Sequence, residues 1–97
     1  MAKNKTTASA RHILVATESE CQTLKNRIVA GEKFEDLART YSLCPSKTQG
    51  GALGTFSPGM MVKEFDDVVF GEDVGIVHGP VKTDFGYHLV EITDRSF

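Results

Sequence analysis

The chain has 97 residues, enough for one domain with a modest core and too few for a second. Its 11 basic and 13 acidic side chains give a formal charge of −2, so it lacks the basic character typical of proteins that bind nucleic acids or anionic membranes. No apolar run approaches the length of a membrane span, and residues 1–10 lack the apolar core of a secretion signal. We therefore expect a cytoplasmic protein that binds neither nucleic acid nor membranes, with Cys21 and Cys44 as free thiols.

The N-terminal region divides into a polar arm and a first strand. Residues 1–9 are small and polar, which favours a flexible arm, with the folded domain spanning residues 10–97. Residues 10–16 have the alternation of a strand, in which His12 and Leu14 share one face. His12 therefore points in the same direction as a leucine expected in the core.

Two amphipathic helices are predicted next. Thr17 or Ser19 can cap the first, whose apolar residues recur at helical spacing until Gly31 ends it. A second apolar stripe begins at Phe34 and ends near Tyr41. Both helices should pack one face against the sheet.

The stretch from residue 49 to residue 70 combines a glycine-edged strand with a third helix. Residues 42–46 before it should be irregular, because the residue before a proline avoids the helical region. Ser57 can cap the third helix, with Pro58 in its first turn, although Gly59 can delay the start of the helix by one or two residues. The strand and helix together present an apolar shelf made of Leu53, Phe56, Met61 and Phe65. Such a shelf suits a small apolar group, although the same spacing is also typical of an ordinary core.

The C-terminal part is predicted to be a loop followed by a hairpin. The loop covers residues 71–79 and contains His78. The hairpin strands are residues 81–83 and 87–92, and His88 lies on the apolar face of the last strand. Four strands and three helices, with the helices mostly between the first two strands, indicate an α+β fold rather than a doubly wound sheet.

Six short motifs resemble, in order and spacing, the signature blocks of the parvulins, a family of peptidyl-prolyl cis-trans isomerases. The motifs are His-Ile-Leu-Val from His12, Cys-Pro-Ser from Cys44, Gly-Gly-Ala-Leu-Gly-Thr-Phe from Gly50, Gly-Met-Met-Val-Lys-Glu-Phe from Gly59, Gly-Pro-Val-Lys-Thr from Gly79 and Phe-Gly-Tyr-His from Phe85. They look closest to the small single-domain bacterial parvulins. The resemblance implies a parvulin (FKBP-like) fold, a four-stranded, mainly antiparallel sheet surrounded by three to four helices in the order β-α-α-β-α-β-β.

The resemblance also implies roles for individual residues. His12 and His88 would be paired histidines on adjacent central strands, with Thr83 in their hydrogen-bond network and Cys44 facing the peptide bond that rotates. Both histidines can equally be structural, each satisfied by the other and by Thr83. Matching positions imply a substrate-binding pocket formed by Leu53, Met61 and Phe65, supported by Phe56, with Val62 and Phe85 as an apolar rim.

The expected substrate is an unphosphorylated Xaa-Pro segment of an unfolded or folding protein. Phosphate-directed parvulins carry a basic cluster after the first strand, whereas residues 16–19 contain no Lys or Arg to bind a phosphate. Hydrophobic residues should be favoured before the proline. No bond is made or broken, so no metal or cofactor is required, and the chain is expected to act as a monomer.

Two other functions are compatible with the same residues. A parvulin-like domain can bind proline-containing peptides as a chaperone module without accelerating their isomerisation. Alternatively, Cys44, His12 and His88 can be read as a Cys-His hydrolase or metal site. The sequence shows neither a short metal-ligand spacing nor an oxyanion motif, which weighs against the second alternative.

Overall fold

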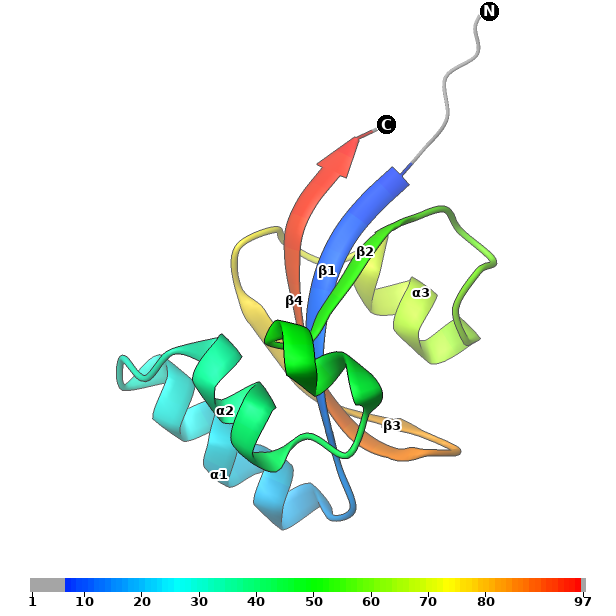
Figure 1. Cartoon of the computed structure of the whole chain (residues 1–97). Coiled ribbons are helices and arrows are strands. Elements are labelled where there is room, and N and C mark those ends of the chain that lie inside the picture. The colour runs from blue at the N-terminus through cyan, green and yellow to red at the C-terminus, as the bar shows by residue number, and fades with distance from the viewer. Residues whose placement is uncertain (1–6, 97) are drawn as a thin grey trace, which may run out of the picture.

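A computed structural model describes residues 7–96 as a four-stranded antiparallel sheet with helices on both faces (Figure 1). The elements are β1 (Thr7–Val15), α1 (Glu18–Val29), α2 (Phe34–Tyr41), the 3-10 helix η1 (Pro45–Gln49), β2 (Ala52–Phe56), α3 (Lys63–Val69), β3 (Val77–Thr83) and β4 (Gly86–Ser96). The strand order is β2-β1-β4-β3, so the long strands β1 and β4 are central. The predicted α+β class and element order are confirmed. In this part of the chain, no helix is long and apolar enough to cross a membrane.

The sheet carries a separate core on each face, because successive side chains of a strand point to opposite sides. On the face covered by α1 and α2, the buried residues are Ile13, Val15, Cys21, Leu24, Phe34, Leu37, Ala38 and Leu89. On the face covered by α3, they are Ala8, Ala10, Phe56, Phe65, Val69, Val90 and Ile92. His12 and His88 belong by parity to the α3 face, as the alternation predicts.

Local signals explain the helices on the first face. The Thr17 hydroxyl accepts the Glu20 N–H and so caps α1, as expected. Arg11 holds α2 to the sheet, since its guanidinium bonds Glu35 at 2.7 Å and lies 4.8 Å from the centre of the Phe34 ring.

Two predicted boundaries of the sheet are wrong. β1 begins at Thr7, so residues 7–9 of the expected arm are part of the sheet, and residues 1–6 lie outside the described part. The predicted loop over residues 71–79 ends earlier, because β3 begins at Val77 and includes His78. A strand containing Gly79 and Pro80 is possible here because β3 is an edge strand, whose outer backbone groups need no partner strand.

The connections around β2 also differ from expectation. The segment expected to be irregular, residues 42–46, runs into η1 at Pro45, although Cys44 has the extended backbone expected before a proline. Ser57 does not cap α3, which begins at Lys63 after Val62. Gly59 explains the delay: its φ of 89° is incompatible with a helix, and Ser57 instead accepts the Met60 N–H in a turn.

Candidate active site

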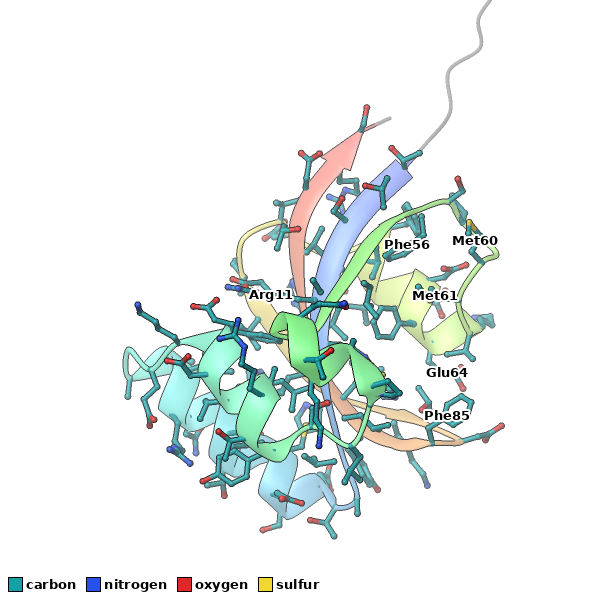
Figure 2. All side chains as sticks on the ribbon, viewed as in Figure 1. Arg11, Phe56, Met60, Met61, Glu64 and Phe85 are labelled. Atoms are coloured by element: carbon teal, nitrogen blue, oxygen red, sulfur yellow. The ribbon has the colours of Figure 1, made fainter. Side chains whose placement is uncertain are left out.

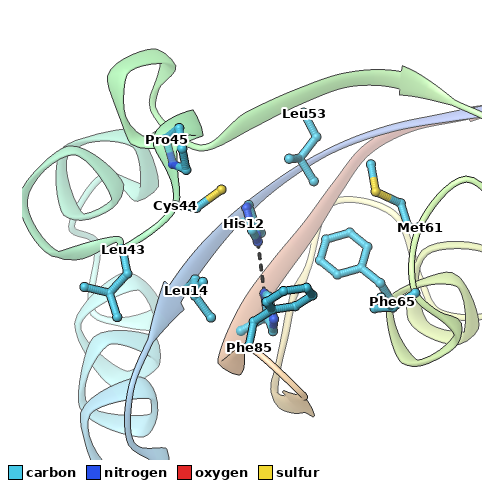
Figure 3. Close-up of a pocket in the computed structure, with 11 residues that line it drawn as sticks. His12, Leu14, Leu43, Cys44, Pro45, Leu53, Met61, Phe65 and Phe85 are labelled. Carbon is cyan, nitrogen blue, oxygen red and sulfur yellow. Dashed lines mark hydrogen bonds between the residues drawn. The ribbon is translucent and has the colours of Figure 1, made fainter.

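A pocket of about 400 Å³ lies on the α3 face of the sheet, between η1 and α3 (Figure 3). Its wall on the η1 side includes Leu43, Cys44 and Pro45, and its wall on the α3 side includes Met61 and Phe65. The complete lining is His12, Leu14, Leu43, Cys44, Pro45, Leu53, Met61, Val62, Phe65, Phe85 and His88. No Asp, Glu, Lys or Arg is among these residues, so the recess is apolar except for its two imidazoles and one thiol.

The two imidazoles come from the two central strands. His12 on β1 and His88 on β4 are 6% and 4% exposed, and their Nδ1 atoms lie 3.0 Å apart. Their rings are nearly parallel, with an angle of 16° between the planes. The expected histidine pair is therefore present in the structure.

Thr83 extends this pair into a network, as expected, although it does not itself line the pocket. Its hydroxyl lies 2.7 Å from Nε2 of His88 and accepts the backbone N–H of Phe85 at 3.1 Å. The network thus ties His88 to the turn between β3 and β4. At its other end, Nε2 of His12 is buried and has no hydrogen-bond partner among residues 7–96.

Burial keeps both histidines neutral near pH 7. Burial, together with the charge of His88, lowers the pKa of His12 to about 4. Burial also lowers the pKa of His88. Neutral imidazoles can each donate one hydrogen bond and accept another, but neither adds a permanent charge to the pocket.

Phe65 joins the polar network to the apolar shelf. Its ring meets both imidazoles edge-on, with centroids 5.5 Å from His12 and 5.7 Å from His88. Leu53 from β2 and Met61, two residues before α3, complete the shelf beside it (Figure 3). The structure brings these three predicted pocket residues together.

The other predicted site residues lie in different positions. Val62 and Phe85 line the pocket, and both are exposed, as a rim requires. Phe56 was expected among the substrate-binding residues, but it is 3% exposed and does not line the pocket. Its ring packs edge-on against Phe70 in the core beneath α3, so it can support the shelf and cannot touch a ligand in the pocket.

Cys44 contributes a free thiol to the wall opposite α3, with its sulfur directed into the pocket (Figure 3). The sulfur forms no hydrogen bond with either imidazole in the structure: Nδ1 of His12 binds His88, and Nε2 of His88 binds Thr83. A cysteine nucleophile needs such a base. Among residues 7–96, no group of three His, Cys, Asp or Glu side chains is placed to bind a metal ion.

Three lining residues were not predicted from the sequence: Leu14, Leu43 and Pro45. Leu14 follows His12 on the same strand face, so the alternation could have identified it. Leu43 and Pro45 lie in an irregular segment without periodicity. A backbone hydrogen bond from Leu43 N–H to the Leu14 carbonyl brings them to the site, and this long-range contact has no local signal.

Gly51 allows η1 and β2 to lie against the strand that carries His12. Its carbonyl accepts the His12 N–H at 3.0 Å, and a Cβ at this position would lie 2.4 Å from the His12 carbonyl oxygen. Its φ of 88° also favours glycine. A glycine here is therefore required for the wall to approach the paired histidines.

A four-stranded antiparallel sheet with a buried histidine pair beside an apolar recess defines a parvulin-type domain, and comparisons with known proteins agree. Residues 1–96 match the family model of the PPIC-type PPIase domain. The chain therefore belongs to the PPIC-type peptidyl-prolyl isomerase family, the parvulins, as the sequence motifs predicted.

Relatives of two kinds are similar to this chain. The foldase protein PrsA of Geobacillus sp. (strain WCH70) is 48% identical over 88 residues, which are 90% of this chain and 32% of that protein. The crystal structure of PrsA from Bacillus subtilis has a TM-score of 0.87 at 40% identity and covers 91% of this chain and 35% of that one. The chain thus spans about a third of the length of these relatives. The solution structure of NmPin, the parvulin of Nitrosopumilus maritimus, has a TM-score of 0.82 at 38% identity and covers 94% of this chain and 98% of that one.

Proposed function

We propose that this domain catalyses cis-trans isomerisation of Xaa-Pro peptide bonds in unphosphorylated segments of unfolded or folding proteins. The observation that carries the proposal is the apolar recess formed by Leu53, Met61 and Phe65 directly beside the buried imidazoles of His12 and His88. This recess has the size and apolar character to take a pyrrolidine ring, which places the preceding peptide bond next to the polar network.

The reaction is a rotation about the amide C–N bond, in which no covalent bond is made or broken. The barrier of ~18–20 kcal/mol arises because the nitrogen lone pair is delocalised into the carbonyl. The planar amide is more polar than the twisted one, so transfer from water to an apolar pocket disfavours the planar ground state. Lowering the barrier by about 4 kcal/mol accelerates the exchange roughly a thousandfold. Desolvation, with hydrogen-bond donors placed for the twisted form, can supply this amount.

A non-covalent mechanism accounts for the position of Cys44. Its side chain is apolar and small enough to pack against the rotating amide, and its sulfur forms no hydrogen bond to His12 or His88 that would activate it. We therefore assign Cys44 to contact with the substrate amide and assign no covalent step to it.

The walls of the pocket favour unphosphorylated, apolar substrates. Leu14 and Leu43 extend the apolar surface beyond the proline shelf, and Leu43 is 63% exposed. The connection from β1 to α1 contains no Lys or Arg, so it offers no cation for a phosphate. Hydrophobic residues before the proline can therefore pack on these walls, whereas a phosphorylated residue loses hydration without gaining a partner.

Exchange NMR spectroscopy on peptides of the type Ala-Xaa-Pro-Phe tests the proposal. Substoichiometric amounts of the protein should broaden the cis and trans resonances or produce exchange cross-peaks between them. The exchange rate should be higher for the peptide with leucine before the proline than for the peptide with phosphoserine. Unchanged exchange rates with all peptides would refute the isomerase. A preference for phosphoserine would refute the proposed substrate class.

A peptide-binding or chaperone module is the second candidate. The observation that favours it is the exposed apolar rim, Leu43, Val62 and Phe85, which can hold an extended chain without acting on the amide. The PrsA relatives carry the name foldase, and this chain corresponds to about a third of them. Peptide binding without accelerated exchange in the NMR experiment would support this candidate. The cytoplasmic location and the monomeric state stay predictions from the sequence.

A further inference from the structure

Helix α3 leaves one of its three acidic side chains, Glu64, without a structural role. Asp66 accepts the Gly59 N–H at 2.6 Å, and Asp67 pairs with Lys63 at 2.8 Å. Glu64 forms no hydrogen bond and no ion pair within residues 7–96. Its charge influences Lys63, but the ammonium of Lys63 binds Asp67. The carboxylate of Glu64 is therefore available to a group outside the fold.

Glu64 borders the pocket without being one of its lining residues. It is exposed, directly precedes Phe65 and follows Met61 by three residues, and both of these neighbours line the recess. In Figure 2 it lies between Met61 and the ring of Phe85, which is 69% exposed on the β3–β4 turn. The α3 side of the mouth thus combines a free carboxylate with exposed apolar surface.

The other charges near the mouth reinforce this arrangement. Asp84 directly precedes Phe85 on the turn and is exposed. Lys82 is the nearest cation along β3, but Thr83 points to His88, so strand alternation places the Lys82 side chain on the opposite face. Lys47 lies in η1, two residues beyond Pro45 of the opposite wall, and does not line the pocket. Lys63, which directly precedes Glu64, is paired with Asp67, so the α3 side of the mouth keeps a net negative charge from Glu64 and Asp84.

We propose that Glu64, assisted by Asp84, selects proline segments that carry a lysine or arginine within one or two residues of the proline. The inference rests on the proposed isomerase function and specifies its substrates. The pocket lining holds no charged carboxylate, ammonium or guanidinium, so charge selection has to come from the mouth. An exposed ion pair changes kcat/KM by a factor of about two to five. The charge selection therefore adjusts a substrate preference that the apolar pocket sets.

Four peptides test this proposal. Two carry Lys or Glu directly before the proline, and two carry Lys or Glu directly after it. The measured quantity is the Lys/Glu ratio of kcat/KM at low ionic strength, in which any effect of a variant on folding or basal rate cancels. At one position at least, the ratio should exceed two. Glu64→Gln should reduce it at least twofold, Asp84→Asn should reduce it less, and added salt should lower it.

Glu72→Gln is the matched control. It changes the net charge by the same amount just beyond the other end of α3, so the ratio should stay at the wild-type value. A ratio near one at both positions, or a ratio that Glu64→Gln leaves unchanged, overturns the inference while leaving the isomerase intact.

A different result separates the two proposals. If no peptide, including a neutral Ala-Leu-Pro-Phe reference, exchanges faster with the protein, the isomerase function fails. The Lys/Glu ratio of dissociation constants, measured by chemical-shift titration with the same peptides and variants, then decides the charge selection by itself. A ratio above two that Glu64→Gln reduces supports the selection, and a ratio near one overturns it.

Discussion

His12 and His88 face each other across the two central strands with their Nδ1 atoms 3.0 Å apart. Only one of these nitrogens carries a proton when both rings are neutral, because two N–H groups or two lone pairs would repel. The Thr83 oxygen accepts the Phe85 N–H, which leaves its hydroxyl hydrogen available to Nε2 of His88. In the tautomer in which the hydroxyl donates to Nε2 of His88, the shared proton lies on Nδ1 of His88, and Nε2 of His12 carries the proton of its ring. The network therefore links the β3–β4 turn to a donor beside the pocket.

Replacement of Thr83 should disturb both ends of this network. Thr83→Val removes the partner of the Phe85 N–H and of Nε2 of His88, and each unsatisfied buried group costs about 1–3 kcal/mol. Thr83→Ser keeps the hydroxyl and is the matched control. Urea denaturation at pH 7 should show the loss of stability for valine alone, and ¹⁵N shifts of the imidazoles should show altered tautomers. Equal stability and unchanged tautomers in both variants would contradict the network.

Acid should destabilise the fold through the same histidines. The pKa of His12 is about 4 in the folded chain, below its ordinary value of 6.5, so the unfolded chain binds the proton more tightly. Stability is therefore constant with respect to His12 above about pH 6.5 and declines as the pH falls toward 4. Over this window His12 alone should cost about 3 kcal/mol, and His88 adds to it in the same direction because burial lowers its pKa. Denaturation at pH 7, 5.5 and 4.5 measures the decline. A pKa near 6.5 for His12, measured by NMR titration of the folded protein, would refute the explanation.

The elements with clear periodicity could be predicted, and those shaped by long-range contacts could not. The alternation around His12 and His88 gave the correct faces of β1 and β4, because successive side chains of a strand point to opposite sides whatever their polarity. The start of β3 was missed because Gly79 and Pro80 oppose a strand locally, and only the edge position permits them. The start of α3 was displaced because Gly59 with positive φ prevents a helix from beginning at Ser57.

The same division applies to the site. Leu53, Met61 and Phe65 could be proposed from a glycine-edged strand followed by helical spacing, but that pattern also fits a core, and Phe56 from the same set is indeed core. The family motifs, more than the spacing, connected His12 with a partner 76 residues away. A backbone hydrogen bond to Leu14 brings Leu43 to the pocket, and no local sequence pattern predicts this contact.

Adjacent methionines allow the proline shelf to be tested with a matched pair. Met61 lines the pocket, whereas Met60 is 68% exposed and its sulfur accepts the Ser57 N–H outside the recess. Met61→Ala removes apolar surface from the ring-binding shelf, which is worth about 1–2 kcal/mol, so kcat/KM should fall roughly five- to thirtyfold. Met60→Ala should retain most of the activity. Equal kinetics for both variants, with lower stability for Met61→Ala, would show that Met61 is ordinary core.

Phe65 offers a second test of the shelf. Phe65→Ala removes a ring that contacts both imidazoles and is 4% exposed, so it should lower stability by about 3–5 kcal/mol as well as activity. Phe65→Leu keeps most of the apolar volume and should remain folded. Exchange NMR spectroscopy on Phe65→Leu should show reduced turnover, because the edge-on contact with the histidines is lost. Turnover at the wild-type rate in Phe65→Leu would show that Phe65 is not part of the substrate-binding surface.

Replacement of Cys44 separates contact with the amide from covalent chemistry. Cys44→Ser preserves the size of the side chain and adds a more polar hydroxyl to an apolar wall, so kcat/KM should fall several-fold without being lost. Cys44→Ala keeps the wall apolar and should retain more activity than serine. This order follows from desolvation of the amide, since a hydroxyl stabilises the polar planar form that the pocket must disfavour. Circular dichroism establishes that both variants are folded before exchange NMR spectroscopy. Complete inactivity of both folded variants would show that the thiol takes part in a covalent step.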